Sequence, residues 1–172
     1  MPSGQPRQVL RPSLLDRLLA GESPQRPLED LHAGALELRR EVLRDLQFLL
    51  STRTTLLGAV AGFQEVGRSV LVYGAPDISS MSAASKDDEK RLNTILTDVI
   101  RRFEPRLDPK SIKVEPVPRA ERQKPADAGN PETLLQFRIS AVLHVEPIHE
   151  MVTFDTHIEV ETGAIRIPEE KA

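Results

Sequence analysis

The sequence predicts an α+β fold, in which helices pack on one face of a largely antiparallel sheet of about four or five strands. Two segments, 34–50 and 86–103, carry apolar residues at the three- and four-residue spacing of an amphipathic helix. Two later segments, 135–145 and 152–160, carry them at every second position, as half-buried strands do. Helices followed by a run of strands are typical of an α+β domain.

Composition indicates one globular domain and excludes several functions. In a chain of 172 residues, 39% apolar and 28% charged residues are typical of a soluble domain with one core. The absence of cysteine excludes disulfides, thiolate nucleophiles and cysteine-based zinc sites. Aromatic residues are only 3% and basic residues are scattered at a net charge of −3, so we expect no nucleic-acid partner. Without a membrane-span or signal-peptide pattern, we expect a cytoplasmic protein with no direct membrane insertion.

The N-terminal segment differs in composition from the rest of the chain. Residues 1–33 are rich in proline, arginine and glycine around one apolar motif, so we expect a flexible segment with a short docking helix. Leu14, Leu15 and Leu18 lie in that helix, which is too short to be stable alone. Residues 34–168 are expected to form a single domain.

The two long helices have clear patterns and, for the second, clear ends. The helix of 34–50 carries a broad apolar stripe, which predicts that it packs on the core. The helix of 86–103 is preceded by Ser85, which has the spacing of a capping box with Asp88. Its first turn is acidic and its last turn is basic, as the helix dipole favours. Pro105 disfavours helical geometry at the residue before it and ends this helix.

Two short strands are expected before the long sheet. Residues 69–73, Ser-Val-Leu-Val-Tyr, predict a short buried strand, after which the chain turns at Gly74. Residues 112–117 alternate between apolar and polar, and Pro116 indicates an edge strand or a strand end. The polar, proline-rich stretch 118–132 is expected to be a long mobile loop.

The last part of the chain predicts a β-meander, and its apolar positions restrict the register. Both apolar sets face one core only if paired residues come from opposite parities. The expected connection between the two long strands is 146–149, and the expected last turn is Thr162-Gly163. The expected pairs are Leu143–Val152, Ala141–Phe154 and Phe137–Ile158 in the first hairpin, then Val160–Ile165 and Ile158–Ile167 in the second.

Three of the four histidines fall in this meander, which raises the question of a metal site. In the expected register His144 lies opposite Met151 and His157 lies opposite Arg138. Both histidines point outward but are far apart along the sheet. A zinc site needs three or four converging ligands. We therefore expect solvent-facing histidines and no metal site.

No sequence pattern points to catalysis. The chain has no glycine-rich phosphate loop and no local signature of a nucleophile. Glycoside hydrolysis would need two carboxylates across one cleft, and no pair lies beside aromatic residues that could bind sugar. We expect a non-catalytic interaction protein without a cofactor.

The end of the second helix, Phe103-Glu104-Pro105-Arg106, allows two interpretations. The motif could serve only to end the helix, with Arg106 bonding to the free carbonyls. The same stiff turn holds Glu104 and Arg106 where both side chains can point the same way. A carboxylate and a guanidinium placed together suit charge-assisted hydrogen bonds to a partner.

Five motifs follow one another over about residues 10–167. They are Ser13-Leu-Leu-Asp-Arg-Leu18, Leu43-Arg-Asp-Leu46 with Leu50-Ser-Thr-Arg53, Ser69-Val-Leu-Val-Tyr-Gly-Ala-Pro-Asp77, Phe103-Glu-Pro-Arg-Leu107, and the meander with Thr162-Gly163. In this order they resemble the TssE family of type VI secretion baseplate proteins, which are relatives of a contractile-phage baseplate wedge protein. Ser51 and Val72 stand where that family usually has Asn, and Thr54 where it has a second Arg.

The resemblance implies a structural role in a cytoplasmic baseplate. The implied hetero-oligomeric partners are TssF-like and TssG-like baseplate proteins and TssB-like and TssC-like sheath subunits. It also implies that the protein helps to initiate the sheath, by accepting a strand at an exposed sheet edge. The implied partner-binding residues are Glu104, Pro105, Arg106, Arg53, Tyr73, Asp77, Leu14, Leu15 and Leu18. No catalytic residue, cofactor or metal is implied.

Two alternatives remain beside this interpretation. The family is often labelled lysozyme-like, which would suggest a peptidoglycan hydrolase, although the label does not reflect a catalytic role in the family. The missing export signal counts against that activity, because the cell wall lies outside the cytoplasm. A wedge protein from a phage tail or another contractile particle would carry the same motifs, and neighbouring genes would distinguish it.

Overall fold

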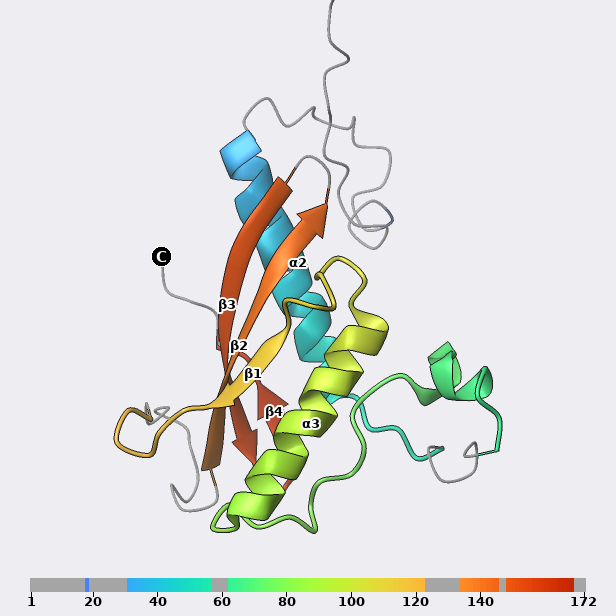
Figure 1. The fold of residues 1–172 in the computed structure, drawn as a ribbon, viewed down its shortest axis with the longest axis vertical. Helices are drawn as coiled ribbons and strands as arrows, with labels where there is room; N and C mark the ends of the chain where they lie inside the picture. The colour runs from blue at the N-terminus through green and yellow to red at the C-terminus, as the bar shows by residue number, and fades with distance from the viewer. Residues whose placement is uncertain (1–17, 19–30, 57–61, 123–133, 146–147, 169–172) are drawn as a thin grey trace, which may run out of the picture.

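Two long helices and a four-stranded antiparallel sheet form the described part of the protein (Figure 1). The computed structural model describes residues 18, 31–56, 62–122, 134–145 and 148–168. Its elements are α2 (Leu31–Ser51), η1 (Val66–Arg68), η2 (Val70–Val72), α3 (Lys86–Phe103), β1 (Lys113–Pro116), β2 (Leu134–Val145), β3 (Ile148–Glu159) and β4 (Ala164–Arg166). The strands lie in the sheet in chain order, and every neighbouring pair is antiparallel.

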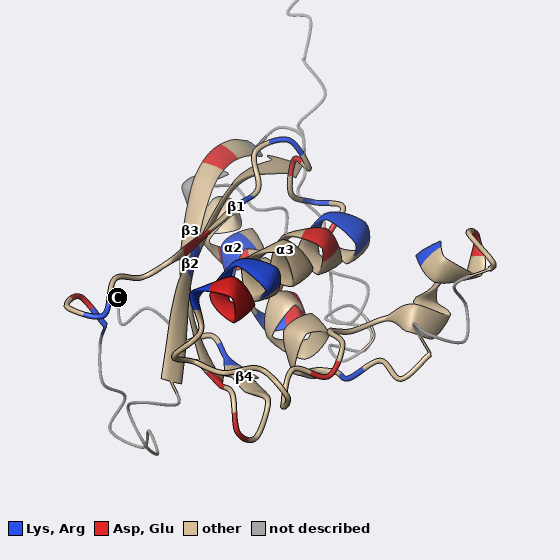
Figure 2. Cartoon of the chain, turned by 60° about the horizontal axis from the view of Figure 1, so that its bottom comes forward, with Lys and Arg blue, Asp and Glu red and all other residues tan. Residues whose placement is uncertain are grey.

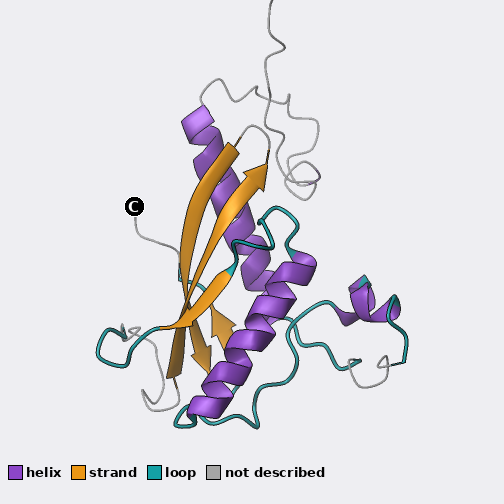
Figure 3. Ribbon diagram, in the orientation of Figure 1, coloured by secondary structure: helices purple, strands orange, loops and turns teal. Residues whose placement is uncertain are grey.

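Both helices pack on one face of the sheet, which confirms the predicted α+β class (Figure 3). Leu46 of α2, Leu96 of α3 and Phe137 of β2 meet in one buried cluster, and each is 0% exposed. Alternate residues of β2 from Leu135 to Leu143 face this core, because successive side chains of a strand point to opposite sides. The core is almost entirely aliphatic, as a composition with few aromatic residues requires.

Helix α3 begins and ends where the sequence predicts, but its N-terminal cap is only half of a capping box. The Ser85 hydroxyl accepts a hydrogen bond from the Asp88 main-chain N–H at 3.2 Å. The Asp88 carboxylate does not return the bond to Ser85, and instead accepts from the Ser82 N–H at 3.0 Å. Asp88 therefore ties the preceding turn to the first turn of the helix.

Replacing Ser85 with alanine should lower the free energy of unfolding by about 1 kcal/mol, because the first turn of α3 loses its side-chain acceptor. Urea unfolding followed by circular dichroism would measure the change. Ser80→Ala, in the exposed turn before the helix, serves as the control and should change stability little. Equal stability of the two variants would contradict the prediction.

The register of the β2–β3 hairpin differs from the predicted one by two residues. Leu143 pairs with Glu150, Ala141 with Val152 and Phe137 with Thr156, so the expected pairs and the expected 146–149 connection are wrong. A shift of two keeps every side chain on its face, so burial does not distinguish the two registers. Cross-strand chemistry does, because the actual register places Arg138 opposite Asp155, 2.9 Å from Nε to Oδ1.

The second hairpin is also shifted by two residues. Ile158 pairs with Ile165 and Glu159 with Ala164, so the expected Val160–Ile165 and Ile158–Ile167 pairs are wrong. The connection therefore has four residues, and Gly163 takes a φ of 66° in it. The Thr162 hydroxyl organises this turn, since it donates to the Glu159 carboxylate and accepts from the Ala164 N–H.

The predicted strand at 69–73 is wrong, because 70–72 form the 3-10 turn η2. The Ser69 hydroxyl accepts from the Leu71 N–H, so a local cap satisfies the backbone where a strand would need a neighbour. Val70 and Leu71 are 81% and 61% exposed, and only Val72 is buried. The predicted turn at Gly74 is confirmed by its φ of 111°.

Candidate interaction site

The turn after α3 is held by a carboxylate–guanidinium pair. Glu104 is 4% exposed, and both of its oxygens accept from Arg106, Oε1 from Nε and Oε2 from Nη2, each at 2.7 Å. Oε1 also accepts from the Arg106 main-chain N–H. The two side chains do lie together, as the sequence suggested, but they bond to each other.

Arg106 also links this turn to α2. Its Nη2 donates to Oδ2 of Asp45 at 2.6 Å, and its Nη1 lies 4.0 Å from Oε2 of Glu41. Burial lowers the pKa of Arg106, but the hydrogen bonds and charge of Glu104, and then of Asp45, outweigh burial and raise it. The guanidinium therefore joins the end of α3 to the middle of α2, 61 residues earlier in the chain.

A pocket of about 300 Å³ lies beside this ion pair. It is lined by Asp45, Leu49, Tyr73, Phe103, Glu104, Pro105 and Arg106. Tyr73 and Phe103 meet edge to face, with ring centroids 5.3 Å apart. The pocket thus has aromatic and aliphatic walls beside a charged side, a combination that suits one apolar side chain with a polar end.

The electrostatic field at Tyr73 is set by this cluster. Burial raises the pKa of its phenol, and the charges of Asp45 and Glu104 raise it further, while Arg106 lowers it. The phenol hydroxyl therefore stays protonated and can donate a hydrogen bond to a group that enters the pocket.

Four of the implied partner-binding residues meet at this pocket, while the others lie elsewhere. Tyr73, Glu104, Pro105 and Arg106 all line it. Arg53 instead donates to the Leu50 carbonyl at 3.0 Å, and burial lowers the pKa of its guanidinium. The Asp77 carboxylate accepts from the Ser79 N–H, and this bond lowers its pKa. Leu18 is 71% exposed, and Leu14 and Leu15 lie outside the described residues.

Sequence reasoning missed the residues of α2 that complete the site. Asp45 and Glu41 lie off the apolar stripe of the helix, where charged residues usually face solvent. Glu41 is nevertheless only 7% exposed, and Asp45 lines the pocket. No local pattern could have revealed this, because the contacts depend on how α2 and α3 pack.

The edges of the sheet are a second candidate interaction surface. Side chains cover two of them, the outer edges of β4 and β1. The outer edge of β4 is closed by α2, where Gln47 accepts from the Ile167 N–H and donates to the Ile165 carbonyl. The outer edge of β1 is covered by Asn93, which donates to the Val114 carbonyl, and Pro116 has no N–H to offer. Neither edge has a free row of backbone groups.

Strand β1 pairs with β2 only from Phe137 to Ser140. The next part of the same edge of β2, at Val142 and His144, is closed by the segment 106–111, which begins at Arg106 of the ion pair. The Arg106 carbonyl accepts from the His144 N–H at 2.8 Å, and the Val142 carbonyl accepts from the Asp108 N–H at 2.9 Å. The Ser111 hydroxyl accepts from the Val142 N–H at 2.8 Å. These bonds also show which β2 residues direct their backbone groups away from β3.

In the described part of the chain, the outer edge of β3 is open over most of its length. Strand β4 pairs only with 157–159, so no described strand lies beside β3 from Met151 to Asp155 (Figure 1). The Ile165 carbonyl points away from β3 to Gln47, so by alternation the odd-numbered residues of β3 direct their backbone groups to this edge. Consistent with this, the Thr153 carbonyl accepts from Nη2 of Arg39 at 3.5 Å.

Other kinds of site receive little support from the described residues. Among them no three His, Cys, Asp or Glu side chains gather into a metal cluster. Neither of the described long helices is long and apolar enough to cross a bilayer. Lys and Arg alternate with Asp and Glu along α3, so that helix has no stripe of one sign (Figure 2).

One of three comparisons with known proteins identifies a family for this chain. The family described as "Baseplate wedge protein gp25" matches residues 36–148, a span that includes most of α2 and all of α3, the ion pair and β2. No curated protein and no solved structure matches. The match covers well over half of the chain, and the resemblance noticed in the motifs is thereby confirmed. The chain belongs to the family of baseplate wedge proteins.

Proposed function

We propose that this protein is a non-catalytic component of a cytoplasmic type VI secretion baseplate, where it joins the wedge to the contractile sheath and helps to start sheath polymerisation. The observation that carries this proposal is the open edge of β3. A strand from a sheath subunit would add there, with main-chain hydrogen bonds for affinity and side-chain pockets for register. Membership of the baseplate wedge family supports the assembly, and the five motifs support the secretion system.

The surface of β3 is suited to strand addition. Met151, Thr153 and Asp155 direct their N–H and C=O groups to the open edge, so an incoming strand finds three donors and three acceptors in a row. Met151 is 64% exposed and adds apolar surface beside them. Among the described side chains, the Arg39 guanidinium bonds to this edge, with its Nη2 3.5 Å from the Thr153 carbonyl oxygen, and an incoming strand would take its place at that carbonyl.

The pocket beside Arg106 is the proposed contact with TssF-like and TssG-like wedge proteins. Its aromatic walls and charged side suit an amphipathic side chain of a partner. Because the Glu104 oxygens are already bonded to Arg106, the pair contributes mainly by fixing the shape of the pocket. The direct contacts then fall to Tyr73, Pro105 and Asp45, with the exposed part of Arg106.

Replacing Thr153 with proline should abolish sheath assembly while the protein remains folded. Proline removes the N–H that faces the open edge and breaks no bond to β2, because the backbone of Thr153 points away from that strand. Thr153→Val is the matched control, since it keeps the N–H and the β-branched shape. Sheaths would be followed in cells by a fluorescent sheath subunit, and stability of both variants by thermal unfolding. Normal sheath assembly with the proline variant would disprove strand addition at this edge.

A further inference from the structure

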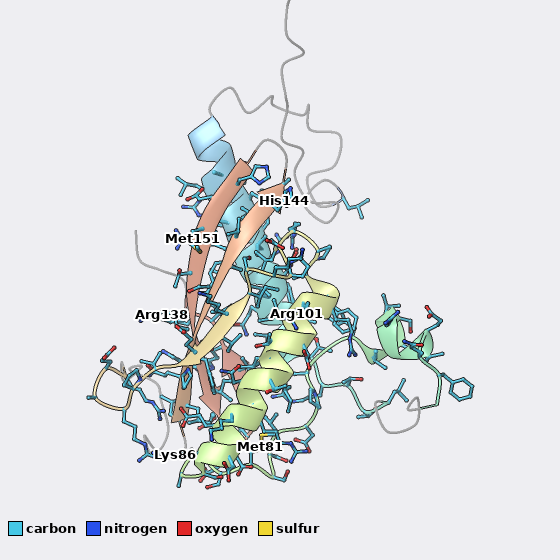
Figure 4. The ribbon with its side chains drawn as sticks, viewed as in Figure 1. Met81, Lys86, Arg101, Arg138, His144 and Met151 are labelled. Carbon is cyan, nitrogen blue, oxygen red and sulfur yellow. The ribbon has the colours of Figure 1, made fainter. Side chains whose placement is uncertain are left out.

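Two histidines face each other near the connecting turn of the β2–β3 hairpin. His144 of β2 is the cross-strand partner of His149 of β3, and the two ring centroids are 4.4 Å apart (Figure 4 labels His144). Both side chains are exposed. The predicted register had placed His144 opposite Met151, so this pair exists only because the true register is shifted by two residues.

The backbone geometry holds the two imidazoles close. The His144 N–H donates away from β3, to the Arg106 carbonyl, so His144 and His149 form a non-hydrogen-bonded pair of the ladder. Side chains in such pairs come nearer to each other than in hydrogen-bonded pairs. The bond to Arg106 also anchors this position of β2 to the turn after α3, which limits the movement of His144.

The separation matches two ligands of one metal ion. A metal–nitrogen bond of about 2.0 Å, with about 1.1 Å from the nitrogen to the ring centre, places each centroid about 3.1 Å from the ion. Two imidazoles at a right angle then have centroids about 4.4 Å apart, and at a tetrahedral angle about 5.1 Å apart. The observed 4.4 Å is the right-angle value.

We propose that His144 and His149 form a bidentate site for a divalent transition metal that prefers square-planar coordination, with Cu²⁺ bound ahead of Ni²⁺. Imidazole nitrogen suits these ions, and affinity at a nitrogen site rises from Ni²⁺ to Cu²⁺. Among the described residues no third His, Cys, Asp or Glu joins the pair, so these two imidazoles are the protein ligands of the proposed site. The site would bind metal reversibly, since two protein ligands and solvent do not enclose the ion.

A bound ion would cross-link the two strands at the end of the hairpin. Because the folded register holds the two imidazoles together and the unfolded chain does not, the ion should bind the folded state more tightly and raise the melting temperature as its free concentration rises. This effect does not depend on the proposed role in the sheath, because it needs only the isolated protein.

Calorimetric titration of the full chain with Cu²⁺ tests the site. We expect one ion per chain, and binding weaker by about tenfold or more when either imidazole is removed, because the second nitrogen of a chelate acts at high effective concentration. His144→Ala, His144→Gln and His149→Ala remove a ligand. His157→Ala is the matched control, since His157 lies on the same strand but opposite Gln136. It should bind Cu²⁺ like the wild type.

Electron paramagnetic resonance gives an independent readout of the same complex. Two equatorial nitrogens should appear in the wild-type and His157→Ala spectra, and one or none in the variants of His144 and His149. The proposal is overturned if the wild type binds no Cu²⁺ at one equivalent, if the His144 and His149 variants bind as tightly as the wild type, or if His157→Ala loses the site.

Discussion

Replacing Arg106 with methionine should destabilise the protein by about 3 kcal/mol. The substitution leaves the Glu104 carboxylate, which is 4% exposed, without the guanidinium that bonds both of its oxygens. An uncompensated buried charge is the main cost of breaking such a pair. Arg106 retains 23% side-chain exposure, so water can reach part of the site and limits the loss. Chemical denaturation monitored by circular dichroism would measure the change in the free energy of unfolding.

The double variant Glu104→Gln with Arg106→Met provides the comparison. It removes both charges of the pair while keeping side-chain volume, so it should be more stable than Arg106→Met alone. A double variant less stable than the single one would contradict the account of Glu104 as the costly group. Co-purification of the folded double variant with TssF-like and TssG-like proteins tests the pocket separately from stability. Unchanged binding would show that this pocket is not one of the proposed contacts.

Replacing Gly74 with alanine should cost about 2–3 kcal/mol, because the backbone there has a φ of 111° that residues with a side chain rarely adopt. A Cβ at this position would lie 2.5 Å from the Thr52 carbonyl oxygen, which is main chain and cannot rotate away. The same carbonyl accepts from the Ala75 N–H, so the clash also disturbs the bridge between 52–54 and 75. Thermal unfolding would measure the loss.

Gly67→Ala is the matched control for that variant. A Cβ on Gly67 meets nothing within 4 Å, and its φ is not positive. The control should therefore keep wild-type stability within about 0.5 kcal/mol. Because Tyr73 precedes Gly74 and lines the pocket, Gly74→Ala should also weaken binding of the proposed wedge partners. Equal melting temperatures for the two variants would show that the strain at Gly74 is not significant.

The features that the sequence predicted well depend on short-range patterns. Helix α3 was predicted from Lys86 to Phe103 because its apolar spacing, its Ser85 cap and Pro105 all act within a few residues. The alternation of β2 and β3 likewise fixed which residues face the core. In these segments local preference and tertiary packing favour the same structure.

The features that were missed depend on contacts between distant segments. A register shift of two residues preserves the face of every side chain, so only pairs such as Arg138–Asp155 distinguish the true register. The apolar run at 70–72 lacks a neighbouring strand, which no local pattern reveals. The partnership of Arg106 with Asp45 joins two helices across 61 positions, so the candidate site was predicted from α3 but not from α2.

Gln47, Asn93 and the segment 106–111 close parts of the sheet edge, and this limits where further strands can add to the sheet. A sheet with two open edges is a repeating unit, since each copy can add to the next without limit. Among the described residues, only the outer edge of β3 remains open to a partner strand. One chain can therefore accept one strand there, and its sheet offers no second described edge to which another strand could add. In the proposed role, such a protein would act as a seed, which sets where a polymer begins and gives it a single direction.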